Sequence, residues 1–295
     1  MNTPDPTTTL LPWHHTTSRG LTLRGAHTPL TGKPVVHFLH GTGFSGLTYW
    51  PLLRRLLPQF DIAVTNAQGH GGSDTGKTFL GWEANAALLH EALLVRKAEW
   101  GDVPVIGMGH SFGGILTTVI ANRQPAVFER LVLLDPIFLP PSHIVLSSVI
   151  RRLGLMHRMP MVKGALSRRA HWRDREAARQ ALHQRGVFRG WDDEAFNAYI
   201  DHALHERDDG LHLHAPPWLE AQVFAGYANS IWRNIRRLAI PCHVIAGDKT
   251  FAHVKNGMLR AQQLNPRITT ATVPGGHCFM QERPDVAAEA VLAAL

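Results

Sequence analysis

A pentapeptide of the form G-x-S-x-G lies near the middle of the chain, at Gly109-His110-Ser111-Phe112-Gly113. A serine hydroxyl becomes a nucleophile when a neighbouring base takes its proton. In this pattern the serine stands on a sharp turn between a strand and a helix, and the flanking glycines let the turn close without Cβ clashes. The apolar run 103–108 precedes the pattern and a helix-like segment, 115–121, follows it. This context predicts that Ser111 is a nucleophile.

A serine nucleophile needs a histidine base, and the histidine needs an acid to orient it. His277 follows two glycines after an expected strand over 268–273, and a helix-like segment comes after it. That position suits a base that turns back toward Ser111. The acid falls between the serine and the histidine in this chain order, and Asp135 and Asp248 each follow an expected strand. From the residues alone, both aspartates are candidates.

Developing negative charge on the substrate oxygen requires two backbone N–H donors. Phe112, directly after the serine, is the first candidate, and the Gly-rich loop 40–44 offers Thr42 or Gly43 as the second. This loop lacks both the G-x-x-x-x-G-K-[ST] and the G-x-G-x-x-G patterns, so nucleotide binding is not predicted. The candidate substrate contacts are His40, Phe44, His110 and Trp218.

The composition is that of an ordinary globular enzyme, with 295 residues, 44% hydrophobic and 18% charged. The net charge of +7 comes from scattered bases such as the pairs Arg151-Arg152, Arg168-Arg169 and Arg236-Arg237, so no nucleic-acid partner is expected. No apolar run reaches the roughly 18 residues that a membrane span needs. The expected partner is a small acyl substrate, without stable membrane insertion, and the protein is expected to be a monomer or homodimer.

Metal ions and cofactors are not expected from the sequence. The chain has 19 histidines but no H-E-x-x-H motif, and His212-Leu213-His214 lacks a third ligand at a recognisable spacing. Cys242 and Cys278 form neither a disulfide framework nor a metal-binding pattern. The chain starts without a secretory-type segment, so a reduced cytoplasmic setting is the expectation.

Strand-like apolar runs alternate with helical stretches, which predicts an α/β fold with a mostly parallel, doubly wound sheet. The expected strands include 35–39, 61–65, 103–108, 131–134, 241–246 and 268–273. Residues 1–139 and 234–295 are assigned to this core. Residues 140–233 are expected to form a helical lid without a buried strand, in which Asp174 and Asp192 cap helices. Residues 1 to about 18 are expected to be a loose arm.

With these residues assembled, the chain resembles the α/β-hydrolase superfamily, in particular its lidded esterase-like and haloperoxidase-like branch. The resemblance covers about residues 20–138 and 236–295 and rests on four motifs in order, which are His40-Gly41-Thr42-Gly43, Gly69-His70-Gly71-Gly72-Ser73-Asp74, Gly109-His110-Ser111-Phe112-Gly113-Gly114 and Gly276-His277. It implies a serine hydrolase with an acyl-enzyme intermediate. Relatives that use an aspartate at the elbow, the haloalkane dehalogenases and epoxide hydrolases, are excluded by Ser111.

The chain departs from the family pattern at the acid. Many relatives place the catalytic aspartate three residues after a strand-end glycine, but here Thr250 follows Gly247 at that spacing. Other members carry the acid after the preceding core strand, where Asp135 stands. The resemblance therefore favours Asp135 over Asp248.

The expected reaction is hydrolysis of a carboxylic ester or related acyl substrate. C–C bond hydrolysis, a ligand receptor without turnover, and cofactor-free oxygen or peroxide chemistry are the alternatives on the same fold. Segment 144–150 is expected to cover the cleft rather than to contact lipid. Aromatic side chains of the lid region are candidates for an acyl pocket, namely Trp172, Trp191, Trp218, Phe224, Tyr227 and Trp232.

Overall fold

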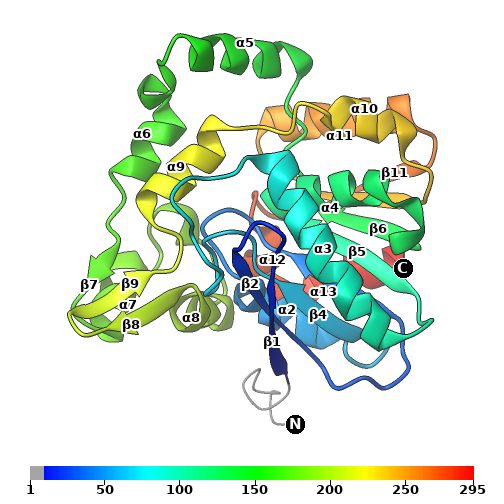
Figure 1. Ribbon diagram of the computed structural model, residues 1–295, viewed down its shortest axis with the longest axis horizontal. Helices are drawn as coiled ribbons and strands as arrows, with labels where there is room; N and C mark the ends of the chain where they lie inside the picture. Colours follow the sequence, from blue (N-terminus) through cyan, green and yellow to red (C-terminus); the bar gives the residue numbers. More distant parts are fainter. Residues whose placement is uncertain (1–9) are drawn as a thin grey trace.

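The computed structural model describes residues 10–295 and is built on a central eight-stranded sheet (Figure 1). The strands lie in the order β1-β2-β4-β3-β5-β6-β10-β11. From β4 to β11 the neighbours in this order are parallel, whereas β1–β2 and β2–β4 are antiparallel. The predicted mostly parallel sheet is confirmed. The strands are β1 (Leu11–Thr16), β2 (Thr22–His27), β3 (Val35–Leu39), β4 (Asp61–Thr65), β5 (Val105–His110), β6 (Arg130–Leu134), β10 (Cys242–Gly247) and β11 (Ile268–Val273).

Helices cover both faces of the sheet, and the strands send alternate side chains to the two sides. In β3, Val35 and Leu39 pack into one hydrophobic cluster, whereas Val36 and Phe38 pack into another. The first cluster includes α3 (Trp82–Trp100), α4 (Phe112–Arg123), α10 (Ile231–Arg237) and α11 (Ala252–Leu264), and the second includes α2 (Trp50–Leu53), α12 (Phe279–Glu282) and α13 (Pro284–Ala294). Burial on both faces explains why central strands such as β3, β5 and β6 are largely apolar runs in the sequence.

An insertion between β6 and β10 lies along one side of the sheet (Figure 1). Its helices are α5 (Pro141–Arg152), α6 (Pro160–Leu166), α7 (Arg175–Leu182), α8 (Asp193–His202) and α9 (Pro217–Ala225). It also contains a small antiparallel sheet of β7 (His171–Trp172), β9 (Gly210–Leu213) and β8 (Leu204–Arg207). The insertion was expected to be helical, without a buried strand, and the three short strands that it contains are partly exposed. They were not predicted, because strands of two to four residues give no alternating pattern long enough to read.

The predicted helix caps in the insertion are confirmed. The Asp174 carboxylate accepts a hydrogen bond from the Ala177 N–H at the start of α7, and Asp192 accepts from Glu194 and Ala195 at the start of α8. Both side chains satisfy backbone donors that have no partner inside the helix.

The N-terminal region departs from the expectation of a loose arm. Residues 11–16 form strand β1, which pairs with β2 along its whole length, and Trp13 is buried in the first cluster. Residues 1–9 of the expected arm lie outside the described residues. In the part of the chain from residue 10 onward, no helix has both the length and the apolar composition for crossing a membrane.

The parallel strands end at the same edge of the sheet, and the candidate site residues follow these ends. The loop with Thr42 comes after β3, Ser111 after β5, Asp135 after β6 and His277 after β11. Open α/β sheets bind their ligands at this edge. The topology thus assembles the four segments that the sequence singled out.

Candidate active site

Ser111 stands on the strained turn that the pentapeptide predicts. Its φ of 52° lies in the left-handed region, which is costly for a residue with a Cβ. The turn requires glycine nearby, since a Cβ on Gly113 would lie 2.1 Å from the Leu39 carbonyl oxygen and one on Gly109 would lie 2.6 Å from the Gly113 backbone. The turn brings β5 close to the start of α4 and places Ser111 in the wall of a cavity at the strand end.

Ser111, His277 and Asp135 are joined by two hydrogen bonds. His277 Nδ1 lies 2.6 Å from Asp135 Oδ2, and His277 Nε2 lies 3.0 Å from Ser111 Oγ. An ionised carboxylate can only accept, so the imidazole proton lies on Nδ1 and Nε2 is free to accept from the serine hydroxyl. This is the arrangement in which a histidine can remove the serine proton.

Asp135 is completely buried, yet its carboxylate is well supplied with donors. The Gly247 N–H donates to Oδ1 over 2.9 Å, and the Thr250 hydroxyl donates to Oδ2, the oxygen that also accepts from His277. Charge buried without such partners would be strongly unfavourable. Thr250, at the position where the family pattern would place an acid, thus binds the acid that comes from β6 instead.

Asp248 does not contact His277. Its carboxylate accepts a hydrogen bond of 2.9 Å from the Gly275 N–H, two residues before the histidine. The side chain therefore shapes the loop that carries His277. Of the two aspartates that the sequence left open, the structure brings only Asp135 to the imidazole.

The loop after β3 distinguishes the two candidates for the second oxyanion donor. The Gly43 N–H donates to His70 Nε2 over 3.0 Å, so this donor is already occupied, contrary to its place among the candidates. The Thr42 N–H has no acceptor among residues 10–295, and Thr42 lines the cavity at Ser111. Phe112 is the first residue of α4, where backbone N–H groups lack intrahelical acceptors. Thr42 and Phe112 are the donors that the geometry leaves available.

A buried tyrosine and histidine connect this loop to the His277 loop, and no motif in the sequence indicated the tyrosine. The Gly41 N–H donates to Tyr49 Oη over 3.0 Å, and the Tyr49 hydroxyl donates to His110 Nδ1 over 2.6 Å. His110 Nε2–H then donates to the His277 carbonyl over 2.9 Å. Burial lowers the pKa of His110 well below its usual range, and the nearby His277 lowers it further. His110 is therefore neutral and fixes backbone, although it also lines the cavity.

His40 and His70 are also neutral and hold backbone groups in place through hydrogen bonds. His40 accepts from the Ala67 N–H over 3.0 Å and donates to the Gly41 carbonyl, while His70 accepts from Gly43 and donates to the Gln68 carbonyl. Burial lowers the pKa of His40 to about 4 and that of His70 to about 3. His40 was a candidate for contacting the substrate, but it does not line the cavity. Both of its ring nitrogens are hydrogen-bonded to backbone groups of the surrounding loops.

A cavity of about 560 Å³ opens at Ser111 and His277. The core contributes Thr42, Phe44 and Phe112, and the insertion contributes residues such as Leu146, Ile150 and Phe224. Most of the wall is apolar. Its charged part is the ion pair between Arg168 and Glu220, with Arg168 Nη1 2.9 Å from Oε2, and a second Arg168 nitrogen donates to Tyr199. Such a wall suits a largely apolar ligand with a few polar contacts.

Only some of the aromatic candidates reach this cavity. Phe44, Phe224 and Tyr227 line it. The four tryptophan candidates, Trp172, Trp191, Trp218 and Trp232, do not. Trp172 and Trp191 are buried in the second hydrophobic cluster, Trp232 is buried in the first, and Trp218 packs against the first. The four indoles stabilise the interior of the protein, which is the usual role of large aromatic residues.

A histidine pair in the insertion has a third potential ligand that the sequence did not reveal. His171 of β7 lies directly opposite His212 of β9, and potential ligand atoms of these two and Asp209 lie within 4.8 Å of one another. However, His212 Nε2 is bonded to the Asp209 carboxylate and His171 Nε2 to the Asp209 carbonyl, each over 2.8 Å. These hydrogen bonds account for the cluster without a metal ion.

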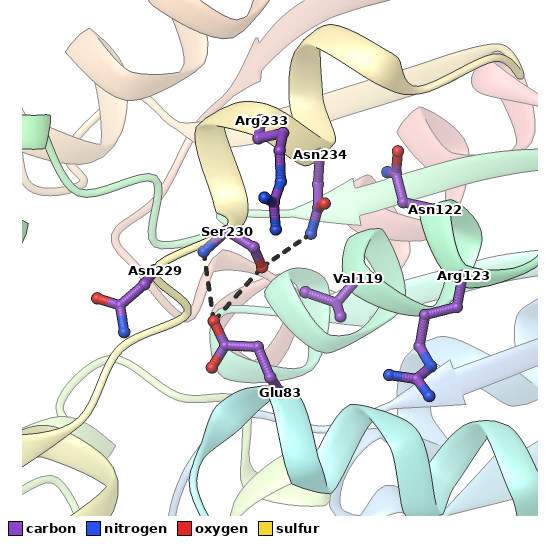
Figure 2. Close-up of a pocket in the computed structure, with 8 residues that line it drawn as sticks. All are labelled: Glu83, Val119, Asn122, Arg123, Asn229, Ser230, Arg233 and Asn234. Atoms are coloured by element: carbon purple, nitrogen blue, oxygen red, sulfur yellow. Dashed lines mark hydrogen bonds between the residues drawn. The ribbon is translucent and has the colours of Figure 1, made fainter.

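A second pocket, of about 510 Å³, lies between α3, α4 and α10 (Figure 2). Glu83 accepts weak hydrogen bonds from the Ser230 N–H and hydroxyl, and Asn234 donates to the same hydroxyl. The eight lining residues include neither histidine nor cysteine, and the hydroxyl of its one serine faces the Glu83 carboxylate rather than an imidazole. The chemistry is therefore assigned to the cavity at Ser111.

Comparison with known proteins fits this geometry. The family model described as "Alpha/beta hydrolase family" matches residues 38–290, which span the elbow and the His277 loop. The chain belongs to the alpha/beta hydrolase family. Its fold is close to that of E-2-(acetamidomethylene)succinate hydrolase, with a TM-score of 0.78 and 18% identity over 96% of this chain and 98% of the other. The thioesterase domain from the curacin biosynthetic pathway has a TM-score of 0.75 and 16% identity over 96% and 99%.

The curated relatives are similar over shorter stretches. Lipase LipV of Mycobacterium tuberculosis is 35% identical over 36% of this chain and 38% of its own length. The type I acyl-CoA thioesterase mpaH of Penicillium roqueforti is 30% identical over 52% of this chain and 36% of its own. The match thus spans less than two fifths of either relative. Together with the family model, these relatives support a hydrolase.

Replacing Tyr49 with phenylalanine tests the connection between the two loops. The Tyr49→Phe variant leaves the Gly41 N–H and His110 Nδ1 without their common partner, and we expect a free energy of unfolding lower by about 1–3 kcal/mol. Because the loop after β3 and the His277 loop lose their link, kcat for a soluble ester should fall by roughly tenfold, with KM changed much less. Steady-state kinetics and urea unfolding measure both effects. Unchanged kcat would mean that the link does not position these loops.

Acid should destabilise the fold through the buried neutral histidines. The folded pKa values of His40 and His70, about 4 and about 3, lie below the unfolded value of 6.5, so the unfolded state binds more protons in between. These two groups do not lower the free energy of unfolding above pH about 6.5. Below that pH, and down to the folded pKa, each group lowers it by about 1.4 kcal/mol per pH unit. Urea unfolding at a series of pH values measures the slope. His70→Gln should reduce it, and an identical slope in that variant would contradict the assignment.

Proposed function

We propose that the protein is a serine hydrolase that cleaves a carboxylic ester or a related acyl compound. The observation that carries the proposal is the pair of hydrogen bonds from Ser111 to His277 and from His277 to Asp135, at the mouth of a largely apolar cavity. The similarity to a lipase and to an acyl-CoA thioesterase supports acyl transfer, and the thioesterase keeps thioesters within the substrate class.

The proposed reaction begins with attack of Ser111 Oγ on the acyl carbon. His277 Nε2 takes the hydroxyl proton, and Asp135 stabilises the imidazolium that forms. The negative charge on the former carbonyl oxygen is met by the Thr42 and Phe112 N–H groups at the end of β3 and the start of α4. The imidazolium then protonates the leaving group, and an acyl-enzyme remains on Ser111. Water, deprotonated by His277, attacks this ester and releases the acid and the free serine.

We infer that residues 140–233 act as a lid that selects the acyl group. Helices α5, α6 and α9 contribute Ile150, Met161 and Phe224, which line the same cavity as Ser111. The proposed acyl pocket is therefore assembled jointly by core and insertion. Substrates of different chain length would differ in their contacts with these insertion residues.

A fluorophosphonate probe should label Ser111 irreversibly, since it reacts with serines activated by a base. We expect labelling and p-nitrophenyl ester hydrolysis in the native protein, neither in Ser111→Ala, and a loss of several orders of magnitude in His277→Ala. Ser147→Ala is the matched control, because Ser147 also lines the cavity. Labelling is read by mass spectrometry. An unlabelled Ser111, or labelling without turnover of esters or thioesters, would contradict the hydrolase proposal and favour a ligand-binding role.

The two aspartates should respond very differently to neutralisation. Asp135→Asn removes the charge beside His277 Nδ1, and we expect kcat to fall by about 10⁴. Asp248→Asn alters a loop contact only, so kcat should stay within about tenfold. Because Thr250 already touches the Asp135 carboxylate, adding Thr250→Asp to Asp135→Asn should restore part of the lost rate. Steady-state kinetics of the three variants measures these changes in kcat. A larger loss in Asp248→Asn would show that the acid is assigned to the wrong residue.

A further inference from the structure

The outer surface of α5 and α6 exposes apolar side chains that no other part of the described chain covers. Helix α5 has no buried residue, and it lies at the far end of the insertion, away from the sheet (Figure 1). Six of the thirteen large hydrophobic residues that are exposed in residues 10–295 fall within this short region, namely Val145, Leu146, Val149, Leu153, Met161 and Leu166. Val145 and Val149 lie four residues apart on α5, and Leu153 continues the same spacing directly after the helix, so the three form one stripe. We call this surface the outer face.

The charged residues of the segment that carries the outer face have a single sign. From residue 136 to residue 173 the chain contains no aspartate or glutamate. Arg151, Arg152, Arg158 and Lys163 are all exposed there, and none has an ion-pair partner among the described residues. Two copies of the outer face would therefore repel each other. The complementary partner combines negative charge with an apolar interior.

The cavity opens beside the same surface. Leu146 and Met161 are 56% and 61% exposed, and both also line the cavity. Val187 and Phe251 are about half exposed and complete an apolar rim. A partner on the outer face would therefore lie against the cavity mouth.

We propose that the outer face docks the protein on the surface of a lipid bilayer that carries anionic headgroups. An amphipathic helix with an apolar stripe and flanking arginines binds such a surface by inserting the stripe at the headgroup level, while the basic groups contact the headgroups. Docking of this kind is peripheral and requires no spanning helix. The docking itself stands apart from the proposed hydrolase activity; delivery of a lipid acyl chain to Ser111 through the rim is a consequence that rests on that activity.

Vesicle binding tests the docking directly. Sedimentation with phosphatidylcholine vesicles containing about a third phosphatidylglycerol should capture the native protein at least about tenfold better than pure phosphatidylcholine, and high salt should release it. Val145→Asp/Val149→Asp should abolish capture, because charge enters the inserted stripe. Arg151→Glu/Arg152→Glu should weaken it by at least about tenfold. None of these four residues lines the cavity, so hydrolysis of a short soluble ester should be unchanged in both variants.

Matched controls lie on the core. Leu259→Asp replaces a half-exposed leucine of α11, and Arg236→Glu/Arg237→Glu reverses an exposed arginine pair of α10; both should bind vesicles like the native protein. Thermal unfolding, monitored by circular dichroism, shows whether each variant is folded. Absence of binding to anionic vesicles would overturn the proposal, as would equal loss in the controls. A concentration-dependent dimer that Val145→Asp/Val149→Asp dissociates, without vesicle binding, would show that a second copy covers the outer face instead.

Discussion

The hydrogen bond between the buried Asp135 carboxylate and His277 Nδ1 is the interaction on which the arrangement of the site depends. It fixes the tautomer that leaves Nε2 facing Ser111, and it ties the loop after β11 to the end of β6. A carboxylate with no exposed surface is tolerable only because Gly247 and Thr250, from the loop after β10, also donate to it. Three strand ends therefore meet at one charged group. The parallel sheet brings the three strand ends close together, and the Asp135 carboxylate orients the His277 imidazole.

Neutral histidines hold the loops around this group. His40, His70 and His110 are each buried, each uses both ring nitrogens, and burial lowers the pKa of each. A neutral imidazole offers one donor and one acceptor at a fixed angle, which suits a site where a loop N–H and a neighbouring carbonyl must both be satisfied. This use explains part of the unusual histidine content. It also occupies the Gly43 N–H, so that Thr42 is left to face the cavity.

The sequence predicted the parts of the site that depend on local backbone. Ser111 requires a turn that only a glycine-flanked residue can form, and His277 follows a terminal strand, so both have signatures within a few residues. Contacts between distant segments left no such signature. Tyr49 joins Gly41 to His110 from a short helix whose sequence has no distinctive pattern. The Gly43 N–H is bonded to a histidine that lies 27 residues away in the chain. Likewise, the insertion strands pair across long separations and are too short for alternation to be read.

The position of the acid shows what the fold constrains and what it leaves free. Strands β6 and β10 are parallel neighbours in which Leu134, the last residue of β6, pairs with Ile245. The loops that follow the two strands meet at the Asp135 carboxylate beside His277. Thr250, from the second loop, touches the carboxylate that Asp135 brings from the first. Either loop can therefore supply the charge, provided that the other supplies a donor to a carboxylate that water does not reach. The physical requirement is a paired carboxylate at this point in space, and this requirement survives a change in which strand carries it.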